Sequence, residues 1–151
     1  MDSLGRPDKF TIRRATSVAE VAAAEYLFDG PVRAEWAERF LTAGGHHLFL
    51  AYDSDGGGEE PTPVGFVSGV ETTHPDKGTE MLLYELAVAE PYRRRGLGRA
   101  LVRRLDALAA GAGLLRDVGA DRHRNDVALA TYRSAGGKDD GSCSVVTWDF
   151  T

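Results

Sequence analysis

The stretch that decides the fold is residues 81–98, MLLYELAVAEPYRRRGLG. Its first part, Met81–Val88, is a nearly continuous apolar run, which is typical of a strand covered on both faces. Pro91 ends that run, and arginines and glycines follow it. The next segment, Gly98–Ala110, carries apolar side chains at helical spacing, namely Leu101, Val102, Leu105 and Leu108. The sequence therefore predicts a buried strand, then a turn rich in arginine and glycine, then a helix.

This turn has the composition of an anion-binding site. Gly96 and Gly98 let the backbone pass close to a ligand and present successive N–H groups to it. At a helix N-terminus those donors and the helix dipole favour phosphate, and the side chains of Arg93–Arg95 add charge-assisted hydrogen bonds. A P-loop is excluded because no Gly-Lys-Ser/Thr follows, and the dinucleotide fingerprint is excluded because Leu101 replaces its third glycine. The alternative is a solvated arginine cluster. Arginines at a helix N-terminus are unfavourable because they oppose the helix dipole, so their presence there favours an anion-binding role.

The rest of the chain predicts alternating strands and helices. Ser17 and Glu20 form a capping box that opens a helix. Strands are expected at Phe10–Arg13, His47–Tyr52, Val64–Thr73, Leu114–Ala120 and Ser144–Phe150, and further helices at Ser17–Phe28, Val32–Thr42 and Asn125–Ser134. This alternation indicates an α/β or α+β fold with a mixed sheet. At 151 residues the chain fits one domain, residues 1–151.

Charge and composition exclude several classes of function. Residues 91–105 hold six arginines and no acid, although the whole chain has a net charge of −5, so a small basic spot lies on an acidic body. Broad nucleic-acid binding would need a wide basic face, so we expect no nucleic-acid partner.

No apolar run is long enough for a membrane span, and the N-terminus does not resemble a signal peptide. Cys143 is the single cysteine and no Cys/His spacing resembles a zinc site, so a cytoplasmic, metal-free protein is expected. The histidines look like loop or surface residues and receive no role.

Two motifs together resemble the GNAT superfamily of N-acetyltransferases. Arg93-x-x-Gly96-x-Gly98 after a buried strand is similar to the family's coenzyme A pyrophosphate signature. Asn125-x-x-Ala128-x-x-x-Tyr132-x-x-x-Gly136 is similar to its helix with a coenzyme A-contacting Asn and a Tyr. The resemblance implies a GNAT fold (α+β), a mixed, mostly antiparallel sheet of about seven strands, splayed at the acetyl-CoA site and flanked by four helices. One departure is Gly137-Lys138, where the family commonly has an aromatic residue after the glycine.

The resemblance also implies an acetyl-CoA site. The pantetheine would pair with the backbone at the end of the buried strand, and the pyrophosphate would rest on the amides of residues 94–100. The residues so assigned to coenzyme A are Leu86, Ala87, Val88, Arg93, Arg94, Arg95, Gly96, Leu97, Gly98, Arg99, Ala100, Asn125, Ala128 and Tyr132.

Two side chains are candidates for catalysis. Glu85 stands within the apolar strand, where burial disfavours an ionised carboxylate and suits a general base, although a Glu paired with a helix arginine is the alternative. The resemblance implies that Glu85 removes a proton from the amine, directly or through water. It implies that Tyr132 protonates the departing thiolate, while a core aromatic is the alternative. The amide of Val88 is the implied donor to the thioester oxygen.

The acceptor is narrowed by a looser resemblance. Residues 84–88 with the arginine turn, Leu27–Gly30 and Thr147–Phe150 resemble the type I aminoglycoside 3-N-acetyltransferases. An acidic body also suits a polycationic amine. The implied substrate contacts are Asp29, Glu35, Tyr84, Glu85, Asp126 and Asp149. The expected reaction is acetylation of the 3-amino group of an aminoglycoside. Another amine (a polyamine, an amino acid or a protein N-terminus) and a non-catalytic coenzyme A-binding module are the alternatives, and the family resemblance allows a homodimer.

Overall fold

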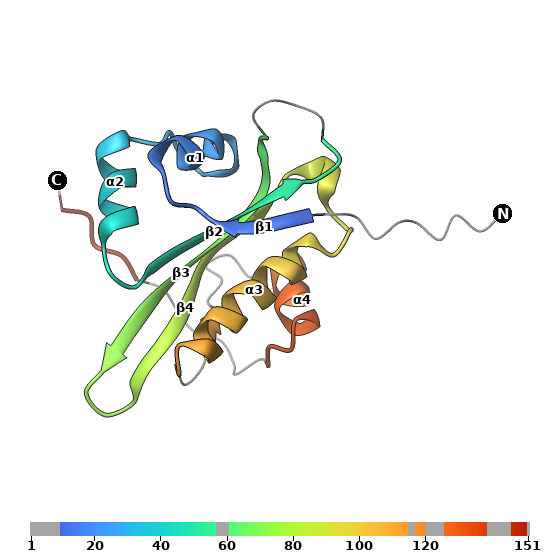
Figure 1. Cartoon of the computed structure of the whole chain (residues 1–151). Coiled ribbons are helices and arrows are strands. Elements are labelled where there is room, and N and C mark those ends of the chain that lie inside the picture. The colour runs from blue at the N-terminus through green and yellow to red at the C-terminus, as the bar shows by residue number, and fades with distance from the viewer. Residues whose placement is uncertain (1–9, 57–60, 115–116, 120–125, 139–145, 151) are drawn as a thin grey trace.

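A sheet with helices on both faces makes up the fold (Figure 1). The computed structural model describes residues 10–56, 61–114, 117–119, 126–138 and 146–150. The strands follow one another across the sheet in sequence order: β1 (Phe10–Arg14), β2 (His46–Asp53), β3 (Pro63–His74), β4 (Gly78–Val88) and β5 (Asp117–Gly119). Each of the first four is antiparallel to its neighbour, whereas β5 runs parallel to β4. The mixed, mostly antiparallel sheet is therefore confirmed.

In the described ranges, four α-helices cover the two faces of the sheet. They are α1 (Val18–Ala23), α2 (Ala34–Thr42), α3 (Leu97–Gly111) and α4 (Asp126–Ser134), with short 3₁₀ turns η1 (Glu25–Leu27) and η2 (Glu90–Tyr92). One face carries α1 and α2, and the other carries α3 with α4 beside it (Figure 1). The capping residue is confirmed, because Ser17 Oγ accepts a hydrogen bond from the Glu20 amide at 3.2 Å. The single helix expected from Ser17 to Phe28 is wrong, since α1 ends at Ala23 and η1 follows.

Five strands, rather than about seven, are present in the described part of the chain. The strand expected at Ser144–Phe150 is wrong for residues 146–150, which are not in a strand. The apolar side chains there are exposed, Val146 at 68%, Trp148 at 72% and Phe150 at 96%. Alternating apolar residues form a strand only where a neighbouring edge can pair with them, and the sequence pattern does not reveal whether one is within reach.

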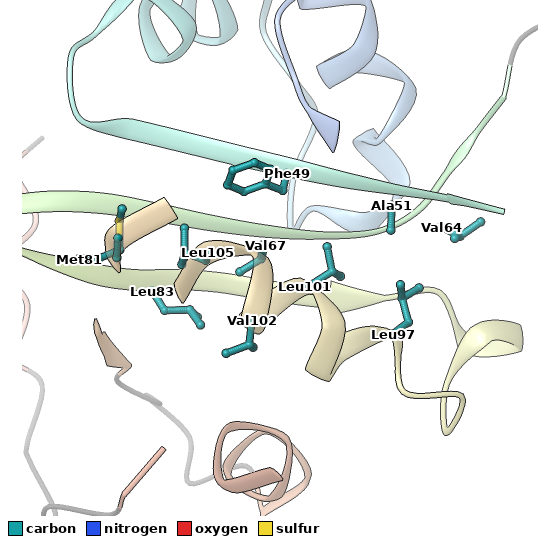
Figure 2. Packing of buried hydrophobic residues seen from close by; sticks show 11 residues of the cluster. Phe49, Ala51, Val64, Val67, Met81, Leu83, Leu97, Leu101, Val102 and Leu105 are labelled. Carbon is teal, nitrogen blue, oxygen red and sulfur yellow. The ribbon is translucent and has the colours of Figure 1, made fainter. Parts of the chain in front are cut away.

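Close packing of α3 on β3 builds the larger core cluster (Figure 2). Leu101 and Leu105 on α3 are fully buried. Gly69 makes this approach feasible, because a Cβ there would lie 2.9 Å from Leu105 Cδ1 and 2.9 Å from Met81 Sδ. Gly65 plays the same part nearer the N-terminus of α3, where a Cβ would lie 3.3 Å from Leu101 Cδ1. The position of α3, and hence of the turn that precedes it, is fixed by these contacts.

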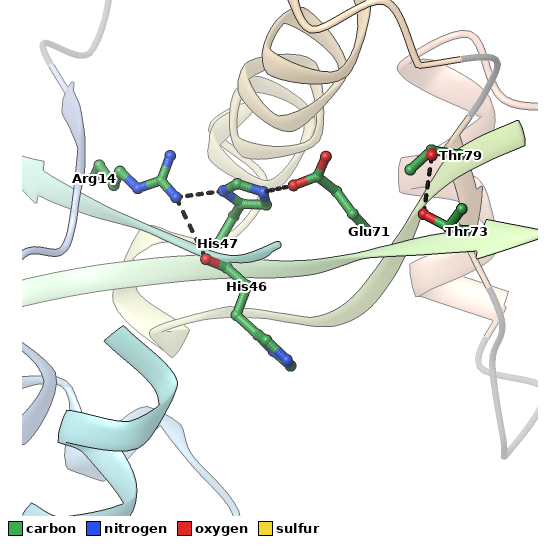
Figure 3. Close-up of polar contacts among 6 residues, drawn as sticks. All are labelled: Arg14, His46, His47, Glu71, Thr73 and Thr79. Carbon is green, nitrogen blue, oxygen red and sulfur yellow. Dashed lines mark hydrogen bonds and ion pairs between the residues drawn. The ribbon is translucent and has the colours of Figure 1, made fainter. Parts of the chain in front are cut away.

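A polar cluster joins β1, β2 and β3 on the α3 face of the sheet (Figure 3). Arg14 Nη2 donates a hydrogen bond to His47 Nδ1, and His47 Nε2 lies 2.8 Å from Glu71 Oε2. Because a guanidinium only donates, Nδ1 must accept, so the hydrogen of a neutral His47 is on Nε2 and is donated to Glu71. His47 is buried at 8% exposure, so the expectation that the histidines are loop or surface residues is wrong here. The side chain of His46 points to the opposite face of the sheet (Figure 3).

The connection after α1 is attached to the start of β3 by a tyrosine. The Tyr26 hydroxyl donates a hydrogen bond to the carbonyl of Pro63. Partial burial, and secondarily the nearby Tyr92 phenol, raise the pKa of Tyr26 above its ordinary value. The phenol therefore stays protonated at neutral pH and keeps its donor, and any stabilisation from it is lost only as the pH rises through the raised pKa.

Candidate active site

A β-bulge in β4 places the predicted base. The register pairs Ser68 with Glu85 but Gly69 with Leu83, so Tyr84 is an extra residue on β4. The Glu85 amide is not orphaned there, because it donates to Ser68 Oγ at 3.1 Å. Before the bulge, Met81 and Leu83 join the cluster under α3, whereas after it Leu86 and Val88 do. The bulge therefore reverses the alternation of faces.

That reversal moves Glu85 to the other face of the sheet. Strict alternation from Met81 and Leu83 would place Glu85 under α3 with them. Instead Glu85 and the neighbouring Tyr84 both line a pocket on the face that carries α1 and α2. Glu85 is partly buried and Tyr84 is exposed at 56%, so only the first half of β4 is covered on both faces as the sequence predicted.

The pocket has a volume of about 530 Å³. Its lining comes from α1, from the segment between α1 and α2, from α2, and from β2, β3 and β4. Three predicted substrate contacts, Asp29, Tyr84 and Glu85, lie in this lining. Glu35, exposed on α2, and Asp149, exposed in residues 146–150, are not in this lining. Asp126 is the first residue of α4, and its side chain lies outside what the structure describes. The structure thus brings together three of the acceptor residues that the sequence suggested.

Several lining residues were missed by reasoning from the sequence. Trp36 lines the pocket and is 55% exposed, and the guanidinium of Arg33 stacks on its ring at 4.4 Å from the centroid. Phe40 and His46 also line it, with their rings edge to face at 5.4 Å. Trp36 and Phe40 are four residues apart, the spacing of one helix face, so the sequence does carry a signal for these two. No sequence signal pointed to His46, because its role depends on which way β2 faces.

Among the described residues no strand pairs with the outer edge of β4 beside this pocket. The amides of Glu85 and Ala89 both donate toward β3, to Ser68 Oγ at 3.1 Å and to the Val64 carbonyl at 2.8 Å. Backbone groups alternate in direction along a strand, so those of Leu86 and Val88 point the other way. In the described residues β5 pairs with β4 only from Met81 to Leu83. This edge suits an extended amide chain such as pantetheine at Leu86 and Val88, whereas the backbone of Ala87 is directed at β3.

The arginine turn is held in place by two of its own side chains. Arg93 Nε donates to the Val88 carbonyl at 3.0 Å. The Arg95 guanidinium lies over the rings of Phe10 and Tyr92, at 5.1 Å and 5.2 Å from their centroids. Arg94 and Arg99 are exposed on the same turn. Arg93 and Arg95 thus have contacts that fix the turn to β4 and β1, while Arg94 and Arg99 are exposed at positions from which a guanidinium could pair with an anion.

Three amides at the start of α3 are suited to a pyrophosphate. Leu97, Gly98 and Arg99 occupy the first helical positions, whose N–H groups have no partner within a helix. The Ala100 amide is different, because it donates to the Gly96 carbonyl at 3.0 Å. The expected set of amides from residue 94 to residue 100 therefore ends one residue earlier. Gly98 also keeps α4 close, since a Cβ there would lie 3.2 Å from Thr131 Cγ2.

The helix with the second motif lies against this region. Tyr132 and Ala128 are partly buried on α4, and Tyr132 packs on the cluster under α3. Asn125 lies outside the described residues. The unusual Gly137 has a structural reason, because its amide donates to the Tyr132 carbonyl at 2.9 Å and a Cβ would lie 2.9 Å from that oxygen. An aromatic residue at this position would collide with the end of α4.

Replacing Gly96 by Ala is expected to weaken acetyl-CoA binding about 5- to 30-fold. Gly96 has φ of 79° with no atom near its would-be Cβ, so the cost is backbone strain of about 1–2 kcal/mol rather than crowding. The strained turn relaxes in the free protein and must be restored on binding. Titration calorimetry with acetyl-CoA measures the effect, and Gly44→Ala, at an open position without positive φ, is the matched control. Equal affinities for the two variants would contradict this reading of the turn.

Neither a metal site nor a membrane span is found where the structure can be described. In the described ranges no group of three His, Cys, Asp or Glu side chains could hold a metal ion. None of the helices in those ranges is long and apolar enough to cross a membrane.

Comparison with known proteins agrees with this geometry. The model of the Acetyltransferase (GNAT) family matches residues 15–136. Among curated protein sequences no relative matches the chain.

Solved structures share the fold at low identity. A crystal structure of an aminoglycoside acetyltransferase from an uncultured soil metagenomic sample, in complex with trehalose, has a TM-score of 0.76 at 19% identity, covering 94% of this chain and 95% of that one. AAC(6′)-Iy in complex with a bisubstrate analogue, CoA-S-monomethyl-acetylneamine, has a TM-score of 0.76 at 16% identity and 95% and 99% coverage. The aminoglycoside 6′-N-acetyltransferase AAC(6′)-Ih from Acinetobacter baumannii has a TM-score of 0.74 at 12% identity and 95% and 100% coverage. With most of its length matched by the family model and its fold shared with these enzymes, the chain belongs to the GNAT family of acetyltransferases.

Proposed function

We propose that this protein transfers the acetyl group of acetyl-CoA to a primary amine of a small molecule, with an aminoglycoside as the acceptor. The observation that carries the proposal is the position of Glu85. The β-bulge places Glu85 in the lining of a pocket beside the edge of β4 that no described strand pairs with. An amine bound in this pocket would lie next to a thioester held along that edge.

The donor site is formed by backbone more than by side chains. Leu86 and Val88 would pair with the pantetheine amides, and the amides of Leu97, Gly98 and Arg99 would hold the pyrophosphate. Arg94 and Arg99 would add charge at its rim. Bound acetyl-CoA supplies an activated acetyl thioester. A homologous enzyme with a coenzyme A bisubstrate analogue supports the assignment.

Glu85 is proposed to accept the proton that the amine must lose. An ammonium group has no lone pair for attack, so a carboxylate within reach of it, directly or through one water, raises the reactive fraction. The N–H of Val88 points to the open edge and is proposed to donate to the thioester oxygen as negative charge develops there. These two groups, with the positioning that the pocket provides, account for the chemistry without a covalent acyl-enzyme.

The acceptor is proposed from similarity together with two carboxylates. Asp29 and Glu85 line the pocket and can each pair with one ammonium group. Enzymes of the same fold are named for acetylation of the aminoglycoside 6′-amino group, whereas the resemblance of the sequence motifs favoured the 3-amino group. Identification of the acetylated nitrogen in the product distinguishes the 3-amino from the 6′-amino group.

The test is thiol release from acetyl-CoA with gentamicin, kanamycin, spermidine, an amino acid and a short peptide. Turnover with the aminoglycosides supports the proposal, and NMR of the product gives the acetylated nitrogen. Turnover confined to another amine would overturn the acceptor class and keep the activity. Tight acetyl-CoA binding without turnover on any amine would favour a coenzyme A-binding module instead.

Replacing Tyr132 by Phe is expected to lower kcat about 10- to 100-fold and to leave the Kd of acetyl-CoA unchanged. The proposed role of the phenol is to protonate the departing thiolate, a contribution of the size found for general acids. The ring packs on the cluster under α3 and is kept by Phe, so the fold is preserved. Steady-state kinetics and calorimetry measure the two quantities. A kcat equal to that of the parent protein would leave Tyr132 as a core aromatic only.

A further inference from the structure

The acceptor pocket is more apolar than a polycation requires. Most of the side chains that line it are hydrocarbon or aromatic, including Phe28, Val32, Trp36, Phe40, Leu48 and Tyr84. Asp29 and Glu85 are the only carboxylates among the described lining residues. A desolvated ammonium group without an acidic partner is costly. A ligand with four or five ammonium groups would find a carboxylate for only two of them among the described lining residues.

A positive charge in the lining strengthens this point. Arg33 lies over the ring of Trp36 at 4.4 Å, and within the described part of the chain no carboxylate pairs with it. Its guanidinium therefore repels any further ammonium group that approaches this side of the pocket. The stack also holds the Trp36 ring in one orientation, as a flat wall.

Two large aromatic side chains are exposed in this pocket. Trp36 is 55% exposed and Tyr84 is 56% exposed, although both line a concave surface. Tyr84 owes its exposure to the bulge that also places Glu85. Exposed aromatic faces inside a pocket mark a site for an apolar or planar ligand. Here they lie in the same lining as the proposed base.

We infer that this pocket also acetylates arylalkylamines, in which one ammonium group is carried on an aromatic body. The aromatic body would lie against Trp36 and the aliphatic lining, and the nitrogen would reach Glu85. The amine nitrogen forms the new bond to the acetyl carbon while the carbon–sulfur bond breaks. The ammonium nitrogen loses two protons: the first passes to Glu85 before attack, and the second balances the proton that Tyr132 is proposed to give to the sulfur, which leaves with the bonding electron pair. Because the acetyl donor is acetyl-CoA, the inference rests on the proposed function.

The experiment compares tryptamine, 2-phenylethylamine, n-butylamine and gentamicin as acceptors for the whole protein. The kcat/KM of tryptamine is expected to exceed that of n-butylamine by about tenfold or more, given an aromatic contact of about 0.5–1.5 kcal/mol added to the area buried. Trp36→Ala is expected to remove most of this advantage by raising the KM for tryptamine. The Kd of acetyl-CoA is expected to stay unchanged.

Matched variants keep the test sharp. Trp148→Ala removes a tryptophan that is 72% exposed outside the pocket and should leave the tryptamine to n-butylamine ratio unchanged. Trp36→Phe keeps an aromatic ring at this position and should retain most of the advantage of tryptamine over n-butylamine in kcat/KM. Arg33→Gln is expected to raise kcat/KM for gentamicin more than for tryptamine, since it removes a repelling charge.

The outcomes separate this inference from the proposed function. Turnover of gentamicin or n-butylamine with no gain for the aromatic amines would overturn the inference and leave acetyl transfer standing. If Trp36→Ala leaves the preference for aromatic amines in kcat/KM unchanged, the assignment of the Trp36 ring as the surface that binds the aromatic body would be overturned. No turnover with any amine, with acetyl-CoA still bound, would overturn both.

Discussion

Replacing Glu85 by Gln is expected to lower kcat by about 100-fold or more while acetyl-CoA binds as before. A positioned general base contributes about 10²- to 10⁴-fold to a proton-transfer step. Gln has nearly the same shape and keeps hydrogen bonding, so it removes the base and preserves the packing in the pocket. The Glu85 amide bond to Ser68 Oγ is a backbone contact and is retained. Steady-state kinetics with saturating acceptor, together with calorimetry of acetyl-CoA, measure the effect.

Two further variants define the role of this carboxylate. Glu90→Gln, at an exposed position on η2 outside the pocket lining, is the matched control and should keep the parent kcat. If Glu85 accepts the amine proton, we expect kcat/KM of the parent protein to fall at low pH as this carboxylate is protonated, and we expect Glu85→Gln to lack that contribution to the pH profile. Unchanged kcat in Glu85→Gln would remove the base from the mechanism. A rise in KM alone would make Glu85 an acceptor-binding group.

Replacing Leu105 by Ala is expected to lower the free energy of unfolding by about 2–5 kcal/mol, the usual cost of such a cavity. Leu105 is fully buried on α3 and its methyl groups abut Gly69. Gly69→Ala should also destabilise the fold, by about 1–3 kcal/mol, because its Cβ would lie 2.9 Å from both Leu105 Cδ1 and Met81 Sδ. Urea unfolding of each variant measures the loss.

The double variant distinguishes close packing from two independent losses. In Leu105→Ala with Gly69→Ala, the added methyl group occupies space that the shortened side chain leaves, so the loss should be smaller than the sum by about 0.5–3 kcal/mol. Arg103→Ala, exposed on the same helix, is the control and should change stability by less than about 0.5 kcal/mol. Strict additivity would show that α3 does not pack on β3 through Gly69.

Local features of this protein could be predicted from the sequence because they depend on neighbouring residues. The N-cap at Ser17, the strand that ends at Val88 and the helix through Leu101 and Leu105 follow from capping chemistry and apolar spacing. The turn at Gly96 could also be predicted locally, because glycine is the residue that most readily takes the left-handed conformation found there before α3. The strand expected at the C-terminal end failed because its pattern requires a partner edge that lies elsewhere in the chain.

The roles within the turn needed the tertiary structure. Three consecutive arginines are equivalent in the sequence, yet Arg93 is bonded to the Val88 carbonyl and Arg95 lies over Phe10, which comes from the other end of the chain. Asp29 and Glu85 line one pocket and Asp149 does not, although the sequence suggested all three as contacts of the acceptor. Distances between such residues depend on how the elements pack.

By itself the sequence determined most of the strands and helices, the arginine- and glycine-rich turn before α3 and the presence of Glu85 in β4. Only the tertiary structure decided which way that residue faces. Alternation along β4 would place Glu85 under α3, and the extra residue Tyr84 turns it to the acceptor pocket. A bulge is defined by the register between two strands, with Gly69 opposite Leu83 and Ser68 opposite Glu85. Register is a relation between distant segments, so no local pattern in β4 contains it.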